Sequence, residues 1–236
     1  MDVIMLPGYW LGGSSWRDVA PIVAKAGHSV HPLTLPGLEA RDASRAGITL
    51  QTQIDAAIAE IDGCRGPVAL VAHSGASAVA NGALDARPDR VTRVIEVDTF
   101  PMPERGQTES EYPVDGDDVP LPDWSAFGEA EVKGLTPELR AQFEAEAVPE
   151  PAGVATAPIE LHDERRYDVP LTMICTAFPS AEYTPLLEQG HPWVSELAKF
   201  RDITWVDIDT GHWPQFSKPV ELGEAIAAAL AEPAAS

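Results

Sequence analysis

VALVAHSGASAV, at residues 68–79, joins two contrasting sequence patterns. Residues 68–72 form a continuous apolar run, which is typical of a strand buried on both faces within a parallel sheet. From Ser74 onward the chain is rich in small residues, which allow a helix to pack closely against such a sheet. We therefore expect a sharp strand-to-helix turn at Ser74, where the side chain projects above the sheet edge and can act as a nucleophile.

The turn departs from the GxSxG pattern that usually surrounds a serine nucleophile. Ala72 and Ala76 occupy both glycine positions and give AHSGA. Alanine is still small enough for the strand and helix backbones to approach each other, so the nucleophile interpretation stands. A structural interpretation, in which Ser74 only caps the helix, also fits this segment when it is taken alone.

A second signal lies near the carboxyl end, in ITWVDIDTGHWPQFSKP at residues 203–219. This segment places His212 in a loop just beyond a predicted strand. A histidine in such a loop can reach a serine at the end of a neighbouring strand and accept its proton. The serine precedes the histidine, which is the order expected when a serine on such a turn is paired with a histidine base. The two signals together therefore predict Ser74 as nucleophile and His212 as general base.

Short strand patterns alternate with helical patterns along most of the chain, which predicts βαβ units and a mostly parallel α/β sheet flanked by helices. The expected strands lie at residues 3–6, 29–33, 68–72, 91–97, 171–175 and 203–208. The expected helices lie at residues 15–26, 50–61, 74–84, 192–200 and 220–230.

Residues 101–168 break this alternation, because proline, glycine and acidic residues are frequent there. Helical patterns occur in this region only at residues 124–132 and 137–148. The aromatic and leucine side chains of the region supply enough apolar surface for docking, so we expect an ordered cap and not a disordered excursion. The predicted division is a discontinuous core of residues 1–100 and 169–232, an inserted cap at 101–168 and a tail at 233–236.

The composition fits one soluble domain of 236 residues with a net charge of −21, which disfavours nucleic acid and anionic membranes as partners. No apolar stretch is long enough to cross a bilayer, and the amino terminus lacks the basic region of a signal peptide, so we expect a cytoplasmic protein. Cys64 and Cys175 lack the spacing of a zinc site or a disulfide framework. The six histidines show no paired ligand spacing either, so no metal or cofactor is predicted.

With these residues identified, the chain resembles the α/β-hydrolase superfamily, especially its small esterases related to plant methyl-ester esterases and hydroxynitrile lyases. LPGYWLGGSSW, at residues 6–16, is similar to the family's loop after the first strand, with Pro7 in place of the usual histidine. The resemblance implies an α/β-hydrolase sheet with a cap inserted between the strand-6 and strand-7 positions. It also implies an oxyanion hole built from the backbone amides of Gly75 and of Tyr9 or Trp10.

The family most often carries the acid of its catalytic triad after the strand that follows the cap. Here that strand is followed by TAFPSAEY, at residues 176–183, where Glu182 is the nearby carboxylate and no aspartate occurs. Some branches, including haloalkane dehalogenases and zearalenone-type lactone hydrolases, instead place the acid after the strand that follows the nucleophile helix. RVIEVDTFPMP, at residues 93–103, fits that arrangement, so we assign Asp98 and keep Glu182 and Glu96 as alternatives.

The predicted function is hydrolysis of a neutral, hydrophobic ester or lactone through an acyl-enzyme formed on Ser74. We expect the substrate pocket to be apolar and to contain Trp10, Phe100, Met102, Trp124, Phe127 and Trp213. A hydroxynitrile lyase or carbon–carbon bond hydrolase with the same triad is one alternative, although a lyase normally needs a cationic side chain near its substrate. A non-catalytic ligand-binding protein is another, and a homodimer is left open.

Overall fold

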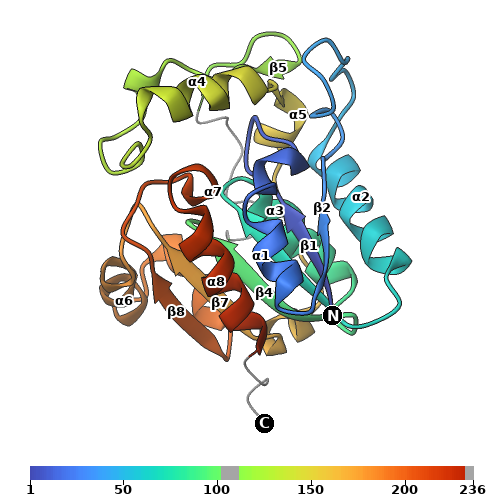
Figure 1. Cartoon of the computed structure of the whole chain (residues 1–236). Coiled ribbons are helices and arrows are strands. Elements are labelled where there is room, and N and C mark those ends of the chain that lie inside the picture. The colour runs from blue at the N-terminus through green and yellow to red at the C-terminus, as the bar shows by residue number, and fades with distance from the viewer. Residues whose placement is uncertain (102–111, 232–236) are drawn as a thin grey trace.

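The structure is a computed structural model that describes residues 1–101 and 112–231 (Figure 1). Within these residues six parallel strands form one sheet in the order β2-β1-β3-β4-β7-β8. The strands are β1 Asp2–Leu6, β2 Ser29–Pro32, β3 Val68–His73, β4 Val91–Val97, β7 Leu171–Cys175 and β8 Ile203–Asp207. The α/β fold class predicted from the sequence is confirmed.

Helices cover both faces of this sheet, and each face has its own apolar core. One face packs against α1 (Ala20–Lys25) and α8 (Pro219–Ala231), and the other against α2 (Leu50–Gly63) and α3 (Ala76–Ala86). The small residues of α3 let it approach α2 closely, because a Cβ at Gly82 would lie 2.4 Å from the Cδ1 atom of Ile54. This close packing holds α3 firmly beneath the site described below.

A separate group of elements connects β4 to β7, and most of it lies above the carboxyl edge of the sheet (Figure 1). It contains a small antiparallel pair, β5 (Asp118–Val119) and β6 (Glu150–Pro151), together with helix α4 (Pro137–Glu146). Its shorter turns are η2 Trp124–Ala126 and α5 Ala152–Ala155, while the last turn, η3 Glu164–Asp168, lies just before β7 and contacts the end of α3. The predicted cap, residues 101–168, spans all of these elements.

An aromatic cluster holds this cap against the core loops. We call it the cap cluster; its buried members are Trp10, Leu11, Phe127, Leu135, Phe143, Ala147, Trp213 and Phe216. Four of these residues, Trp10, Leu11, Trp213 and Phe216, come from the core, and the other four come from the cap. The cap is therefore packed on the core through apolar contacts, which are the main source of stability at such an interface.

The predicted helix at residues 192–200 is wrong. The structure instead has α6 at Ser180–Glu188, followed by two single turns, η4 (Pro192–Val194) and η5 (Leu197–Lys199). The His191 side chain accepts a hydrogen bond from the Trp193 amide and starts a tight turn there. The apolar pattern of this segment is satisfied because the turns bury Val194 and Leu197 without a continuous helix.

Two other predicted helices are shorter than expected. The predicted helix at 15–26 is divided into η1 (Gly13–Trp16) and α1, because Pro21 sits in the first turn of α1, where a missing backbone N–H costs least. The predicted helix at 124–132 is only the turn η2, because Phe127 is extended and ends it. No helix in the described parts of the chain is both long and apolar enough to cross a membrane.

Candidate active site

Ser74 lies on a strained turn between β3 and α3. Its φ of +53° is in the left-handed region, which a non-glycine residue adopts only when the surrounding structure enforces it. The loop after β1 packs directly against this turn, because a Cβ at Gly8 would lie 2.6 Å from Nδ1 of His73 and 3.0 Å from Cβ of Ser74. The strain and the close packing together lift the Ser74 hydroxyl above the edge of the sheet.

Three side chains from distant parts of the chain form one hydrogen-bonded line. The Ser74 hydroxyl donates to Nε2 of His212 at 2.7 Å, and Nδ1 of His212 donates to Oδ2 of Asp98 at 2.6 Å. His212 lies in the loop after β8, and Asp98 directly follows β4. The structure therefore brings together the nucleophile, base and acid predicted from the sequence, at distances that permit proton transfer.

Asp98 is fixed by groups other than the histidine. Its Oδ1 accepts the backbone amides of Thr176 at 2.8 Å and Ala177 at 2.9 Å, and its own φ is +48°. Burial by itself raises the pKa of this carboxyl, but the hydrogen bonds from His212 and Thr176 outweigh burial and lower the pKa. Asp98 therefore stays ionised and holds the imidazole with Nδ1 protonated and Nε2 facing Ser74.

Neither alternative acid contacts the histidine. Glu182 is exposed on α6, and Glu96 is completely buried, where Ser77 and Asn81 bind its carboxyl group. Asp98 is the carboxylate placed at the His212 ring, because the turn after β4 ends level with the loop after β8 at the same edge of the sheet.

The backbone of His212 is held from both sides, which the sequence analysis missed. His73 donates from Nε2 to the His212 carbonyl at 2.6 Å, and the His212 amide donates to the Glu131 carbonyl at 2.7 Å. Burial and the neighbouring His212 lower the pKa of His73 to about 3, so His73 stays neutral. The core and the cap thus each fix one side of the catalytic loop. The position of His73 directly before Ser74 was the only sequence signal for its role.

The three predicted oxyanion-hole residues lie on both sides of Ser74. Gly75 begins the first turn of α3, and Tyr9 packs so closely on it that a Cβ at Gly75 would lie 2.3 Å from the ring. Trp10 has a φ of +66°, and the cap holds it through hydrogen bonds with Val119 and Val148. This arrangement places the Tyr9 ring against Gly75, directly beside the nucleophile.

A cavity of about 430 Å³ opens above the Ser74 hydroxyl. Of the predicted substrate-binding residues, Trp10, Phe100 and Trp213 line it. Trp124 and Phe127, which belong to the cap, pack against Trp213 from behind the cavity wall. Met102 lies outside the described residues. Other side chains that line the cavity were not predicted, namely Tyr9, Ser77, Ala78, Thr99, Tyr112, Glu131, Phe178, Tyr183 and Trp193.

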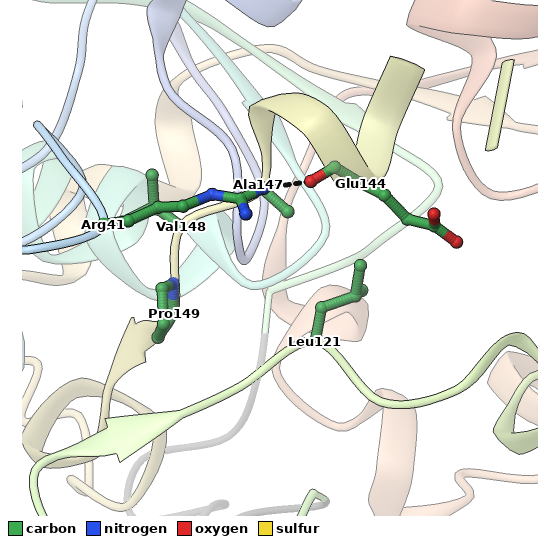
Figure 2. Close-up of a pocket in the computed structure, with 6 residues that line it drawn as sticks. All are labelled: Arg41, Leu121, Glu144, Ala147, Val148 and Pro149. Carbon is green, nitrogen blue, oxygen red and sulfur yellow. Dashed lines mark hydrogen bonds between the residues drawn. The ribbon is translucent and has the colours of Figure 1, made fainter. Parts of the chain in front are cut away.

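A second hollow, of about 280 Å³, lies on the cap and carries no comparable chemistry (Figure 2). Its lining residues are Arg41, Leu121, Glu144, Ala147, Val148 and Pro149. The Arg41 side chain donates to the backbone carbonyl of Glu144, as Figure 2 shows, so its charge is used to join the cap to the core. None of the described residues that line the hollow is a histidine or a candidate nucleophile.

One group of side chains has the composition of a metal site. Among the described residues, ligand atoms of Asp2, His31 and Cys64 lie within 4.8 Å of one another. Both ring nitrogens of His31 already contact carboxylates, Asp2 at 3.2 Å and Glu60 at 2.8 Å. The group lies at the amino ends of β1 and β2, at the opposite edge of the sheet from Ser74, and has no part in the chemistry there.

We expect Gly75→Ala to lower kcat by about tenfold to a hundredfold, because the new methyl group collides with the Tyr9 ring and displaces the oxyanion loop. The check is hydrolysis of an activated ester by the purified variant, together with its Tm. A double variant, Gly75→Ala with Tyr9→Ala, removes the colliding ring and should regain activity. Unchanged kcat in the single variant would contradict this account of the loop.

Comparison with known proteins agrees with the fold. The model of the family described as "Alpha/beta hydrolase family" matches residues 3–225. A carbendazim hydrolyzing esterase from Nocardioides sp. (strain SG-4G) is 31% identical over 109 residues, which are 45% of this chain and 45% of that protein. The match thus spans less than half the length of this curated relative.

Several solved structures share the whole fold. A methylesterase from Arabidopsis superimposes with a TM-score of 0.74 at 19% identity, covering 98% of both chains. A pyrethroid hydrolase from Sphingobium faniae JZ-2 has a TM-score of 0.72 at 21% identity, again over 98% of both chains. An extracellular alpha/beta-hydrolase from a Paenibacillus species has a TM-score of 0.72 at 18% identity, over 97% of this chain and 98% of that one.

Proposed function

Because this chain belongs to the alpha/beta hydrolase family, we propose that it hydrolyses a neutral, hydrophobic carboxylic ester or lactone at Ser74. The observation that carries the proposal is the hydrogen-bonded line from Ser74 through His212 to Asp98, which opens into a cavity with aromatic walls. The chain is an esterase-like hydrolase by its relatives, whose names include esterases, a methylesterase and a pyrethroid hydrolase. Those names favour an ester bond over other acyl bonds.

The geometry supports a two-step reaction. His212 takes the proton from the Ser74 hydroxyl as its oxygen attacks the ester carbonyl, and the amides of Gly75 and of Tyr9 or Trp10 stabilise the oxyanion that forms. The tetrahedral intermediate then breaks down, and His212 gives this proton to the departing alkoxide. The alkoxide leaves as an alcohol, and the acyl group remains bound to Ser74 as the acyl-enzyme. A water molecule attacks the acyl-enzyme by the same route, which releases the carboxylic acid and restores Ser74.

The charge around the cavity supports a neutral substrate. Glu131 and Asp98 line the cavity, and no lysine or arginine is present among the described residues of the lining. The whole chain has a net charge of −21, so its field opposes the approach of an anion. The same field favours departure of the carboxylate product.

A pair of matched substrates tests this proposal. We expect a neutral aromatic methyl ester to be hydrolysed with a kcat/KM about tenfold higher than an ester of the same length that ends in a carboxylate. The difference should shrink as salt rises from 0.02 M to about 1 M, because salt screens the repulsion. Preference for the anionic ester at low salt would contradict the neutral-substrate proposal. A series of esters and lactones of graded size then defines the bond type.

The structure gives the lyase alternative no support. Lys199 and Lys218 are the cations considered for that chemistry, but they form ion pairs with Glu196 and Glu221. Neither lysine lines the cavity. Ester or lactone hydrolysis, which needs no cation at the substrate, therefore remains the better explanation of this site.

A further inference from the structure

A single hydroxyl contacts the chain on both sides of the catalytic acid. Ser77 lies in the first turn of α3, three residues after the nucleophile, and is 2% exposed. Its Oγ is 3.0 Å from Oε1 of Glu96 and 3.1 Å from the carbonyl oxygen of Phe100. Glu96 precedes Asp98 by two residues and Phe100 follows it by two. Ser77 therefore links the nucleophile helix to the turn that carries the acid.

Whether both Ser77 contacts can be hydrogen bonds depends on whether Glu96 carries a proton. The Ser77 hydroxyl has one hydrogen, whereas an ionised Glu96 and the Phe100 carbonyl are both acceptors only. Unless the two acceptors share that single hydrogen, both contacts are hydrogen bonds only if Glu96 carries a proton, donates it to Ser77 and leaves the Ser77 hydrogen for Phe100. The Asn81 amide donates to the same Oε1 atom of Glu96 at 2.9 Å, which a protonated carboxyl oxygen can still accept, and to the Ser77 carbonyl at 2.9 Å.

The surroundings of Glu96 also favour the neutral acid. The residue is 0% exposed, and its Oε2 atom has no hydrogen-bond partner among the described residues. Leaving a charged oxygen buried without partners is costly, and burial raises the pKa of Glu96 to about 7. Ionisation of Glu96 would break one Ser77 contact and leave this oxygen charged.

The neighbours of Glu96 supply no compensating charge. Ala72 and Met173 flank it in the sheet, and Ser77 and Asn81 cover it from α3. Arg93 projects from the opposite face of β4, since side chains alternate along a strand. The other titratable groups on the neighbouring strands and on α3 are paired elsewhere or neutral. Asp98 and His73 bind His212, and Asp85 pairs with Arg166. Burial raises the pKa of Cys175 on β7 and of Tyr183 on α6.

We propose that Glu96 is a positioning residue that acts as a protonated acid, holding the turn at residues 98–100 against the nucleophile helix through Ser77. Loss of its proton releases that turn, which carries both Asp98 and the cavity wall at Phe100. This role rests on the serine-hydrolase function proposed above. Reactivity at Ser74 therefore falls when Glu96 ionises.

The test is the rate at which a neutral fluorophosphonate labels the protein between pH 5 and pH 9. The wild-type rate should fall about fivefold between pH 7 and pH 9, which corresponds to the loss of one hydrogen bond. Glu96→Gln cannot ionise, so its rate should stay level over that range. Ser77→Ala should react more slowly at every pH and show no alkaline fall, while Glu182→Gln, altered at an exposed carboxylate, should keep the wild-type profile.

A thermal measurement checks the protonation directly. The folded protein retains the Glu96 proton up to about pH 7, whereas the unfolded chain releases it near the ordinary pKa of 4.5. Wild-type stability should therefore fall relative to Glu96→Gln as pH rises from 4.5 to 7, and the Tm difference should become constant above that range. Glu150, whose pKa burial also raises to about 7, is the same in both proteins and does not enter the comparison.

The possible failures are separable. A wild-type protein that reacts equally fast at pH 7 and pH 9 overturns the role of Glu96, as does an alkaline fall that persists in Glu96→Gln. A Tm difference that does not vary between pH 4.5 and 7 overturns it as well. A wild-type protein that is folded but labelled at no pH overturns the proposed hydrolase function, and the role of Glu96 with it.

Discussion

Ser74→Ala should abolish hydrolysis of an activated acyl ester, with a loss in kcat of about a millionfold. The hydroxyl oxygen is the atom that attacks the substrate, and it is hydrogen-bonded to Nε2 of His212 at 2.7 Å. Oxyanion stabilisation and substrate binding survive the substitution, so a small activity above that of water is expected to remain. The loss should appear in kcat because the cavity itself is unchanged.

Covalent labelling makes this result decisive. The variant should not react with a fluorophosphonate, and mass spectrometry of the wild-type protein should place the adduct on the peptide that contains Ser74. Ser125→Ala, which removes an exposed hydroxyl on the cap, is the matched control and should be labelled at the wild-type rate. Equal labelling of the Ser74 variant would mean that another residue is the nucleophile, whereas a wild-type protein that is never labelled would indicate a ligand-binding role.

Asp98→Asn should lower kcat by about ten-thousandfold while leaving the fold intact. The amides of Thr176 and Ala177 both donate to Oδ1, so the oxygen of the new amide stays at that position and its NH₂ group turns toward His212. Nδ1 of the imidazole must then accept a hydrogen bond, which moves the ring proton to Nε2. In that tautomer Nε2 cannot accept the Ser74 proton.

Glu182→Gln is the matched control for the acid, because it neutralises the carboxylate found near the more usual position in the family. Glu182 is exposed on α6, so kcat should remain within about twofold of wild type. Steady-state kinetics on one ester at pH 7.5 compares the two variants, and circular dichroism checks their folding. Severe loss in the Glu182 variant with little loss in the Asp98 variant would reverse the assignment of the acid.

Strong local patterns predicted their elements well. The run at residues 68–72 became the central strand β3, and the small residues after Ser74 became α3. The segment at residues 176–200 was predicted poorly, because its prolines and short apolar groups fit either a helix or a series of turns. Only the packing of Val194 and Leu197 into the core selects the turns.

The pocket shows a similar limit. Aromatic residues could be recognised in the sequence as an apolar set, but composition does not say which of them face a cavity. Trp213 faces both the substrate space and the cap cluster, whereas Trp124 and Phe127 pack behind it. Tyr183 and Trp193 line the cavity from a segment whose helix was misplaced, so they could not have been predicted.

The sequence by itself determined the parallel α/β sheet, the turn at Ser74 and the loop that carries His212, because each depends on residues close together in the chain. The sequence favoured Asp98 as the acid, but only the tertiary structure separated it from Glu182 and Glu96 and showed how the histidine backbone is held. Asp98 lies 114 positions before His212 in the chain, and His73 lies 139 positions before it. Their distances are set by how β4, β8 and the cap pack, and no local pattern encodes that packing.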